Sequence, residues 1–526
     1  MPRHTVFILL HLITPIFLFS QSEELASTIQ AAELKQHLDI LASDEMEGRE
    51  TGMTGQKKAA AYISSYFYQL GLPAIGENNS YYQQIAYTAE NWNQVDLQVN
   101  SNKYRHLWDY VSFPTTNADM GSRQFEEVVF VGYGIDDERY SDYFKGPDVR
   151  GKIVLAYMGE PMRADSTSWL TGTRQLTEWS ADWRLKLKAA QRWGAAGILL
   201  IDWQIQKTIS ENRRNLLNPG FRIGRGEEPE KYYASNVFIS PGIAQEIMGK
   251  KYKKVIKTRD RILATGQPQS LAIKCKLELT QAKRTRQIIG ENVLGYFEGT
   301  DPVLKNELVV VTAHYDHLGK KGNEIYNGAD DNASGTSTVM ELAQALALAK
   351  EKGMGPRRSV LCMLVSGEEK GLLGSQYYVE NPIFPLSQTI ANVNIDMVGR
   401  TDEQHADNPD YIYVIGSDRL SSELHEINET MNATHTRLEL DYTYNDENDP
   451  NRYYYRSDHY NFAERGIPAI FYFSGTHEDY HQTTDDAHKI QFDKMEKIAR
   501  LVFYVTWELA NREKRIEVDK GEKVKR

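Results

Sequence analysis

Acidic residues and histidines gather at five places in the C-terminal half of this 526-residue chain, and each place follows or adjoins an apolar run. One such group by itself is typical of a solvated loop. Five groups brought together would repel one another unless a cation joined them. The groups are His314-Tyr-Asp316, Asp330-Asp331, Glu368-Glu369, Asp396 and the segment 475–481. Together they predict a metal centre.

The side chains of these groups match a two-metal site, which takes about five or six donors with one shared between the ions. Two histidines with three carboxylates suit zinc, and cobalt or manganese are possible substitutes. The two cysteines, Cys275 and Cys362, are too few for a cysteine-rich zinc site. We therefore predict two Zn²⁺ ions held by His314, Asp331, Glu369, Asp396 and His481.

Two further acidic residues have predicted catalytic roles. Asp316 lies two residues after His314, so both side chains point to the same face of an extended backbone. The Asp316 carboxylate is predicted to accept the second imidazole N–H of His314 and to orient the ring. Glu368 stands beside Glu369 and points the other way on an extended backbone. We predict that Glu368 is the general base for a metal-bound water.

These groups need a scaffold that brings distant segments to one place. From about residue 290, strand-like apolar runs alternate with helical periodicity, which indicates a mostly parallel sheet with helices on both faces. Strands are predicted at 307–313, 358–365, 390–395 and 468–473, and helices at 334–350, from 372, at 421–431 and at 492–511. In open α/β sheets, ligands bind beyond the carboxyl ends of the strands, where the five groups lie.

The rest of the chain has a different residue pattern. Short strands with one amphipathic helix indicate a smaller, inserted mixed β/α domain, which we assign to 111–275. Residues 22–110 and 276–512 are assigned to the two parts of the larger α/β domain. Residues 513–526 carry mixed charges and are predicted to form a solvated tail.

The N-terminus has the order of a secretory signal peptide, assigned to 1–21. Arg3 and His4 precede the apolar run 6–19, and Ser20-Gln-Ser22 follows it. This order predicts a secreted or periplasmic protein with no stable membrane span, and an uncleaved membrane anchor is the alternative. The net charge of -11 argues against a nucleic-acid partner, because phosphate binding needs a basic patch. The oligomeric state is not indicated.

The C-terminal motifs resemble those of the M28 family of zinc aminopeptidases, in the family's order, from about residue 290 to 490. They are His314-x-Asp316, Gly328-Ala-Asp-Asp-Asn-Ala-Ser-Gly335, Gly367-Glu-Glu-Lys-Gly371, Asn394-Ile-Asp-Met397 and Tyr480-His-x-Thr-x-Asp485. The segment 41–49 also looks like the N-terminal signature of family members, and the middle domain looks like a protease-associated (PA) domain. The resemblance implies the zinc-peptidase (phosphorylase/hydrolase-like) fold with a PA insertion.

The resemblance also implies an exopeptidase that removes residues from peptides with a free N-terminus. By the family's pattern, Asp331 would bridge the two metals and Glu368 would be the proton shuttle. Glu369 and His481 would complete one metal site, and His314 and Asp396 the other. Family members can have a cis peptide bond after the bridging aspartate, which is Asp331–Asn332 in this chain.

Three other functions stay open. A single-zinc glutaminyl cyclase shares the M28 fold, and some PA-plus-peptidase-like proteins are binding receptors with lost ligands. His477-Glu-Asp-Tyr-His481 matches the H-E-x-x-H motif of zinc endopeptidases, but that motif works on a helix and this segment has a loop context. We interpret Ser457 as a helix N-cap and the tyrosine-rich stretch 441–455 as a surface loop.

Overall fold

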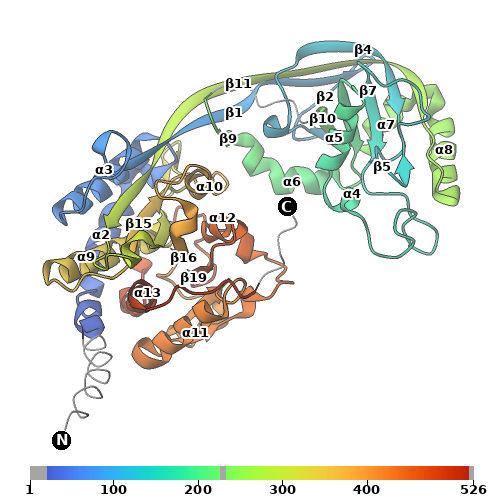
Figure 1. The fold of residues 1–526 in the computed structure, drawn as a ribbon. Coiled ribbons are helices and arrows are strands. Elements are labelled where there is room, and N and C mark those ends of the chain that lie inside the picture. The colour runs from blue at the N-terminus through green and yellow to red at the C-terminus, as the bar shows by residue number, and fades with distance from the viewer. Residues whose placement is uncertain (1–20, 226–232, 521–526) are drawn as a thin grey trace, which may run out of the picture. The chain divides into compact units, whose positions relative to one another are not determined.

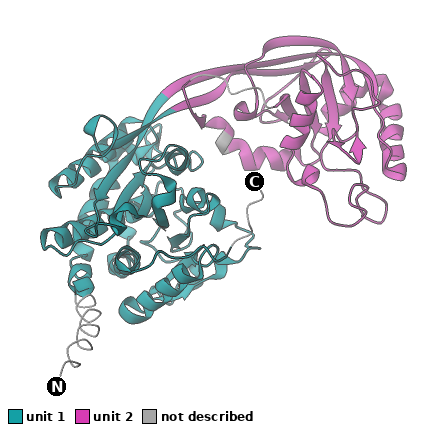
Figure 2. Cartoon of the chain, in the orientation of Figure 1, with its two compact units in different colours: residues 1–86, 288–526 teal, residues 87–287 magenta. Residues whose placement is uncertain are grey.

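The computed structural model describes residues 21–225 and 233–520. The chain divides into unit 1, which comprises residues 1–86 and 288–526, and unit 2, which comprises residues 87–287 (Figures 1 and 2). The two boundaries fall inside two long strands, β1 (Tyr82–Val99) and β11 (Leu271–Phe297). Unit 2 therefore takes in residues 87–110 and 276–287, which the sequence pattern assigns to the larger domain. The predicted signal peptide lies, except for its last residue, outside the described residues.

Unit 1 is built on a sheet with the strand order β18-β17-β19-β16-β12-β15-β11. The four neighbouring strands β19, β16, β12 and β15 run parallel. Only β17 and β11 are antiparallel to their inner neighbours, so the predicted, mostly parallel sheet is confirmed. The strands are β12 (Leu308–His314), β15 (Ser359–Val365), β16 (Thr389–Ile395), β17 (Tyr411–Ile415), β18 (Glu439–Asp441) and β19 (Ala469–Phe473).

Helices cover both faces of this sheet (Figure 1). Successive strand residues point to opposite faces, so Val309 and Val311 of β12 join one hydrophobic core while Leu308 and Val310 join another. The first core is completed by α2, α3, α9, α11 and α13, and the second by α10 and α12. These helices are α2 (Ala31–Leu41), α3 (Thr54–Gln69), α9 (Gly335–Glu351), α10 (Leu373–Glu380), α11 (Ser422–Met431), α12 (His459–Glu464) and α13 (Phe492–Asn511).

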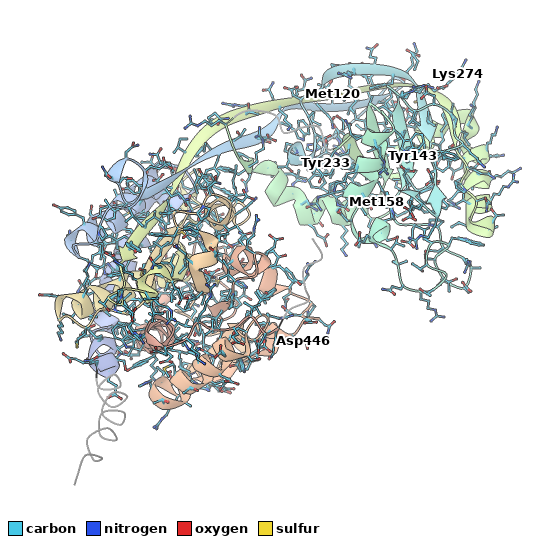
Figure 3. All side chains as sticks on the ribbon, in the orientation of Figure 1. Met120, Tyr143, Met158, Tyr233, Lys274 and Asp446 are labelled. Atoms are coloured by element: carbon cyan, nitrogen blue, oxygen red, sulfur yellow. The ribbon has the colours of Figure 1, made fainter. Side chains whose placement is uncertain are left out.

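The strands of unit 2 continue the same sheet through β11, and β4, β7, β8 and β10 run parallel there. The first part of β11 is antiparallel to β4, β3 is antiparallel to β10, and β1 pairs with β2 and β9. One of its two cores contains the buried Tyr143, with the half-buried Met158 and Tyr233 packed against it (Figure 3). That core includes residues of α5 and α6, and the other includes residues of α7 and α8. The elements are β2 (Asn102–Tyr104), β3 (Tyr110–Val111), β4 (Gly121–Phe130), β7 (Ile153–Tyr157), β8 (Gly197–Ile201), β9 (Gly220–Ile223), β10 (Ser235–Ile239), α5 (Arg184–Arg192), α6 (Ile205–Leu217), α7 (Pro241–Met248) and α8 (Tyr252–Thr265).

In the described part of the predicted solvated tail, residues 513–520, every residue except Ile516 is exposed. Ile516 is buried with 3% of its surface exposed, and Arg515 donates hydrogen bonds to the backbone oxygens of Ser387 and Thr389. The buried Ile516 side chain and the Arg515 hydrogen bonds hold this charged segment against the domain. Within the described part of the chain, no helix has the length and apolar character needed to cross a bilayer.

The buried His459 of α12 makes stability depend on pH. Its ring stacks on Phe471 with 4.8 Å between centroids, and burial lowers the pKa of His459 to about 3. The unfolded chain takes up a proton near pH 6.5, but the folded protein does not, so the free energy of unfolding falls as the pH drops below 6.5.

We expect His459→Phe to remove this loss. Between pH 7 and pH 5, the variant should gain about 2 kcal/mol in unfolding free energy relative to the unsubstituted protein. Urea unfolding at both pH values measures the difference, with exchange of the exposed His488 for phenylalanine as the control. A difference that stays constant with pH would show that the folded protein protonates His459.

Candidate metal centre

The five predicted ligand residues meet at the carboxyl edge of the unit 1 sheet. β12 ends at His314, Asp396 directly follows β16, and Glu369 lies in the loop after β15. Asp331 comes from the segment before α9, and His481 from the turn after β19. Because β19, β16, β12 and β15 are parallel neighbours, their carboxyl ends share one edge, and residues far apart in sequence meet there.

The Asp331 carboxylate lies between two groups of side chains. Its Oδ1 is 3.3 Å from His314 Nε2, which is also 3.2 Å from Asp396 Oδ1. Its Oδ2 is 3.1 Å from His481 Nε2, which is 3.5 Å from Glu369 Oε2. Atoms bound about 2 Å from one zinc ion in tetrahedral directions lie about 3.3 Å apart. Both the imidazole and carboxylate donors and their spacing therefore fit two zinc ions that share Asp331.

The two adjacent glutamates have different electrostatic settings. Burial raises the pKa of Glu368 well above its usual range; His314 opposes this, and Asp396 reinforces it. Burial also acts to raise the pKa of Glu369, but the imidazoles of His317 and His481 bring it down to about 2. Glu369 is therefore held as an anion, as a metal ligand must be, whereas Glu368 can take and return a proton.

Part of the chain matches a known protein family. Residues 292–506 match the family model described as Peptidase family M28. Residues 292–506 are an M28 peptidase domain. The Asp331–Asn332 peptide bond is cis, as the resemblance implies for M28 members.

Curated proteins also resemble part of this chain. Aminopeptidase YwaD of Bacillus subtilis (strain 168) is 29% identical over 216 residues, which cover 40% of this chain and 42% of that protein. A probable zinc metalloprotease of Pyrenophora teres f. teres (strain 0-1) is 28% identical over 262 residues, covering 42% and 51%. The chain thus spans about half the length of the curated relatives it matches.

A solved structure aligns with most of the chain. An aminopeptidase from Aneurinibacillus sp. strain AM-1 aligns with a TM-score of 0.56 and 17% identity, over 95% of this chain and 98% of that chain. At this level of identity, the similarity establishes a shared fold.

Asp316 contacts the M28 site differently from the sequence prediction. The atom 3.1 Å from His314 Nδ1 is the backbone oxygen of Asp316, not its carboxylate. The carboxylate accepts hydrogen bonds from Thr51 Oγ1 at 2.6 Å and from the backbone amide of Glu368 at 3.2 Å. It turns toward these two donors because a fully buried carboxylate needs several hydrogen bonds. Asp316 therefore orients His314 through its main chain and positions Glu368 through its side chain.

Several supporting residues were missed or misread in the sequence. The Ser457 cap is wrong: Asp458 occupies the N-cap position of α12, and Ser457 Oγ instead donates to Asp396 Oδ2 at 2.8 Å. The Asp485 carboxylate accepts from the backbone amides of Asp330 and Asp331 at 3.0–3.1 Å. Asp485 was visible only as part of the Tyr480-to-Asp485 motif, without a role.

His317 is also close to the cluster, with its Nδ1 2.8 Å from Glu369 Oε1. It stands three positions after His314, and this histidine spacing was the available signal.

The H-E-x-x-H match does not form an endopeptidase site. Its residues lie in a turn after β19, with His481 at a φ of 58°, rather than on a helix. His477 Nε2 lies 3.2 Å from Asp330 Oδ2, whereas His481 faces Asp331 and Glu369. The two histidines therefore contact different carboxylates.

A small pocket adjoins the cluster of predicted metal ligands. Its apolar lining comes largely from the C-terminal part of the M28 domain, and Arg456 also lines it. Tyr453 belongs to the stretch interpreted as a surface loop, so one end of that stretch lines the pocket. The apolar and aromatic lining residues are Met397, Tyr453, Phe471, Phe473 and Tyr480.

Arg49 connects the N-terminal segment to the loops that carry the ligands. Its side chain is completely buried and donates to the backbone oxygens of Tyr315 at 2.9 Å, Asn327 at 2.7 Å and Gly328 at 2.9 Å, and to that of Leu41. Burial lowers the pKa of Arg49 to about 10, and the nearby carboxylates act against this change. It therefore remains a cation at neutral pH and offsets part of the negative charge of the cluster.

We expect Arg49→Lys to loosen these loops, because one ammonium cannot reach acceptors on three chain segments. The free energy of unfolding should fall by about 3 kcal/mol, the cost of leaving one or two buried carbonyls without donors. Zinc affinity should fall about 10–100-fold, as for other residues that support ligands. Thermal melting and zinc titration measure the two effects.

Arg465→Lys is the matched control, since its side chain is 46% exposed and its nearest carboxylate contact is 3.9 Å long. Equal stability and zinc affinity for both variants would contradict a positioning role for Arg49.

Proposed function

We propose that this protein is a di-zinc aminopeptidase that removes the N-terminal residue from peptides with a free N-terminus. The observation that carries the proposal is the Asp331 carboxylate, whose two oxygens face two separate groups of zinc-type donors. One relative is named an aminopeptidase and another a probable zinc metalloprotease, which supports the reaction and the metal. His314 and Asp396 would hold one ion, Glu369 and His481 the other, and Asp331 both.

Zinc, when bound, supplies a Lewis acid that polarises the scissile carbonyl group and acidifies water. The protein's own residues handle the protons. Glu368 takes a proton from the attacking water and gives it to the leaving amine, a task that suits its raised pKa. Asp316 holds the Glu368 backbone through the 3.2 Å hydrogen bond to its amide, so the carboxylate is aimed before the substrate arrives.

Recognition of a free N-terminus follows from hydrogen bonding and shape. The side chains of Asp331, Glu368 and Asp396 line the pocket, and their oxygens can accept hydrogen bonds from a free α-amine. An N-acetyl group removes one of those N–H donors and adds bulk. The aromatic lining around Phe471 and Phe473 suits an apolar first side chain.

Unit 2 is proposed to be a PA-like insertion. The support is its place in the sequence between the two parts of unit 1, its mixed strand pairing and its two hydrophobic cores. The order of charged, apolar and small polar residues at 1–22 supports a secreted or periplasmic location.

We expect Glu368→Gln to bind zinc normally but to lose at least about 100-fold in turnover, because the amide cannot transfer the proton. Mass spectrometry of products from a peptide panel measures this, with free, N-acetylated and Gln-initiated members. The exposed Glu464→Gln is the matched control and should keep full activity.

Sequential losses from free peptides alone support the aminopeptidase. Internal cleavage of blocked peptides would indicate an endopeptidase, and loss of ammonia from the Gln peptide alone would indicate a cyclase. Full activity of Glu368→Gln would overturn its role.

Removal of the metal should abolish cleavage. A chelator that strips zinc leaves the carboxylates of Asp331, Glu369 and Asp396 close together without their cations, so stability should fall along with activity. Re-addition of two equivalents of zinc should restore both, as followed by thermal melting and peptide turnover. Full activity at zero metal content would contradict the proposal.

A further inference from the structure

His317 is the one histidine close to the Asp331–Glu369 pair that the family pattern leaves without a role. Its side chain is completely buried, and neither ring nitrogen has a hydrogen-bond partner among the described residues. An unsatisfied buried nitrogen costs about 1–3 kcal/mol, and buried polar groups are rarely left in that state. The backbone amide donates to the Arg49 backbone oxygen at 3.2 Å, so the main chain of His317 is already held.

His317 and Glu369 are in close polar contact. Nδ1 lies 2.8 Å from Glu369 Oε1, yet neither atom makes a hydrogen bond of regular geometry with a described residue. Nδ1 is also 3.8 Å from Asp331 Oδ2. Two buried lone-pair atoms that face each other at this distance are explained if both point at one cation, since ligand atoms on a common zinc lie about 3 Å apart.

The same two carboxylates face His481 from another direction. Glu369 presents Oε1 to His317 and Oε2 to His481, and Asp331 Oδ2 is near both imidazoles. The two rings lie 5.9 Å apart at an angle of 63°. Their nitrogens therefore converge on one pair of carboxylates without blocking each other.

Gly328 leaves room for the His317 ring. This residue has a φ of 55°, and a Cβ atom there would lie 2.5 Å from His317 Cδ2 and 2.1 Å from the backbone oxygen of Asp331. Only glycine leaves room for the ring and for the turn that leads to Asp331. Gly328 therefore accommodates both the His317 ring and the local backbone turn.

We propose that His317 is a fourth protein ligand of the ion at Asp331 Oδ2, Glu369 and His481. This inference rests on the proposed two-metal function. It makes the two positions unequal, because the other group has three protein donors, His314, Asp331 and Asp396. A four-ligand position is typical of tightly held ions, and a three-ligand position leaves room for a reactant. The ion at His317 should therefore bind first and most tightly.

The test uses the full-length protein with its metals replaced by ¹¹³Cd. Correlation spectra between ¹¹³Cd and imidazole protons detect each histidine whose nitrogen binds an ion. We expect three coupled imidazoles, two on one cadmium and one on the other. His317→Asn should remove one of the pair and weaken binding of the first ion more than 100-fold, beyond the effect of a residue that only supports a ligand. The exposed His488→Asn is the control and should change neither readout.

The unsubstituted protein alone decides the question, even if the variant folds poorly. Two coupled imidazoles, one on each cadmium, would overturn the role of His317 and leave the five-residue centre intact. Cadmium without coupling to the rings of His314 and His481 would overturn the proposed centre itself, and the inference with it. Neither result depends on peptide cleavage.

Discussion

The carboxylate of Asp331 is the point on which the centre depends, because its two oxygens face two different groups of side chains. A bridging ligand works only if its position is fixed to a fraction of an ångström. The surrounding chain supplies that precision. The Asp485 carboxylate accepts hydrogen bonds from the backbone amides of Asp330 and Asp331. Arg49 donates to the backbone oxygen of Gly328, which precedes them in the same loop. The loop is thus held by both an anion and a cation.

Charge explains why so many supporting residues are needed. Asp316, Asp331 and Glu369 are buried beside one another, and like charges in a poorly solvated region repel strongly. Imidazoles, the Arg49 guanidinium and two divalent ions would together offset this repulsion. The same charges give the two glutamates different pKa values. The imidazoles near Glu369 lower its pKa and keep it ionised. Burial and the neighbouring acid Asp396 raise the pKa of Glu368, so it holds its proton more firmly.

The sheet accounts for the meeting of residues that are distant in sequence. Four parallel neighbouring strands end at one edge, and each of their following loops contributes to the site or its pocket. The apolar lining of the pocket beside the cluster comes mainly from β19 and the segment around Tyr453, so the groups proposed to bind a substrate side chain lie next to the donors. Unit 2 has separate cores, and its fold needs none of these residues.

Much of unit 1 could be predicted because its signals are local. The central strands and helices lie within one residue of their predicted ends, since a buried parallel strand is a short apolar run and an amphipathic helix repeats every 3.6 residues. The long strand β11 escaped prediction because its exposed middle, residues 284–287, has no apolar pattern, although the pairing with β4 and β15 orders both ends.

The sequence by itself determined which residue types gather, in what order, and at which strand ends, because strand direction and chemistry are both encoded locally. Only the tertiary structure decided which atoms they use. The Asp316 backbone oxygen replaces its carboxylate beside His314, Ser457 donates to Asp396 rather than capping a helix, and His317 turns its nitrogen to Glu369. Two of these contacts join segments tens of residues apart and the third depends on side-chain torsions, and neither is recorded in spacing along the chain.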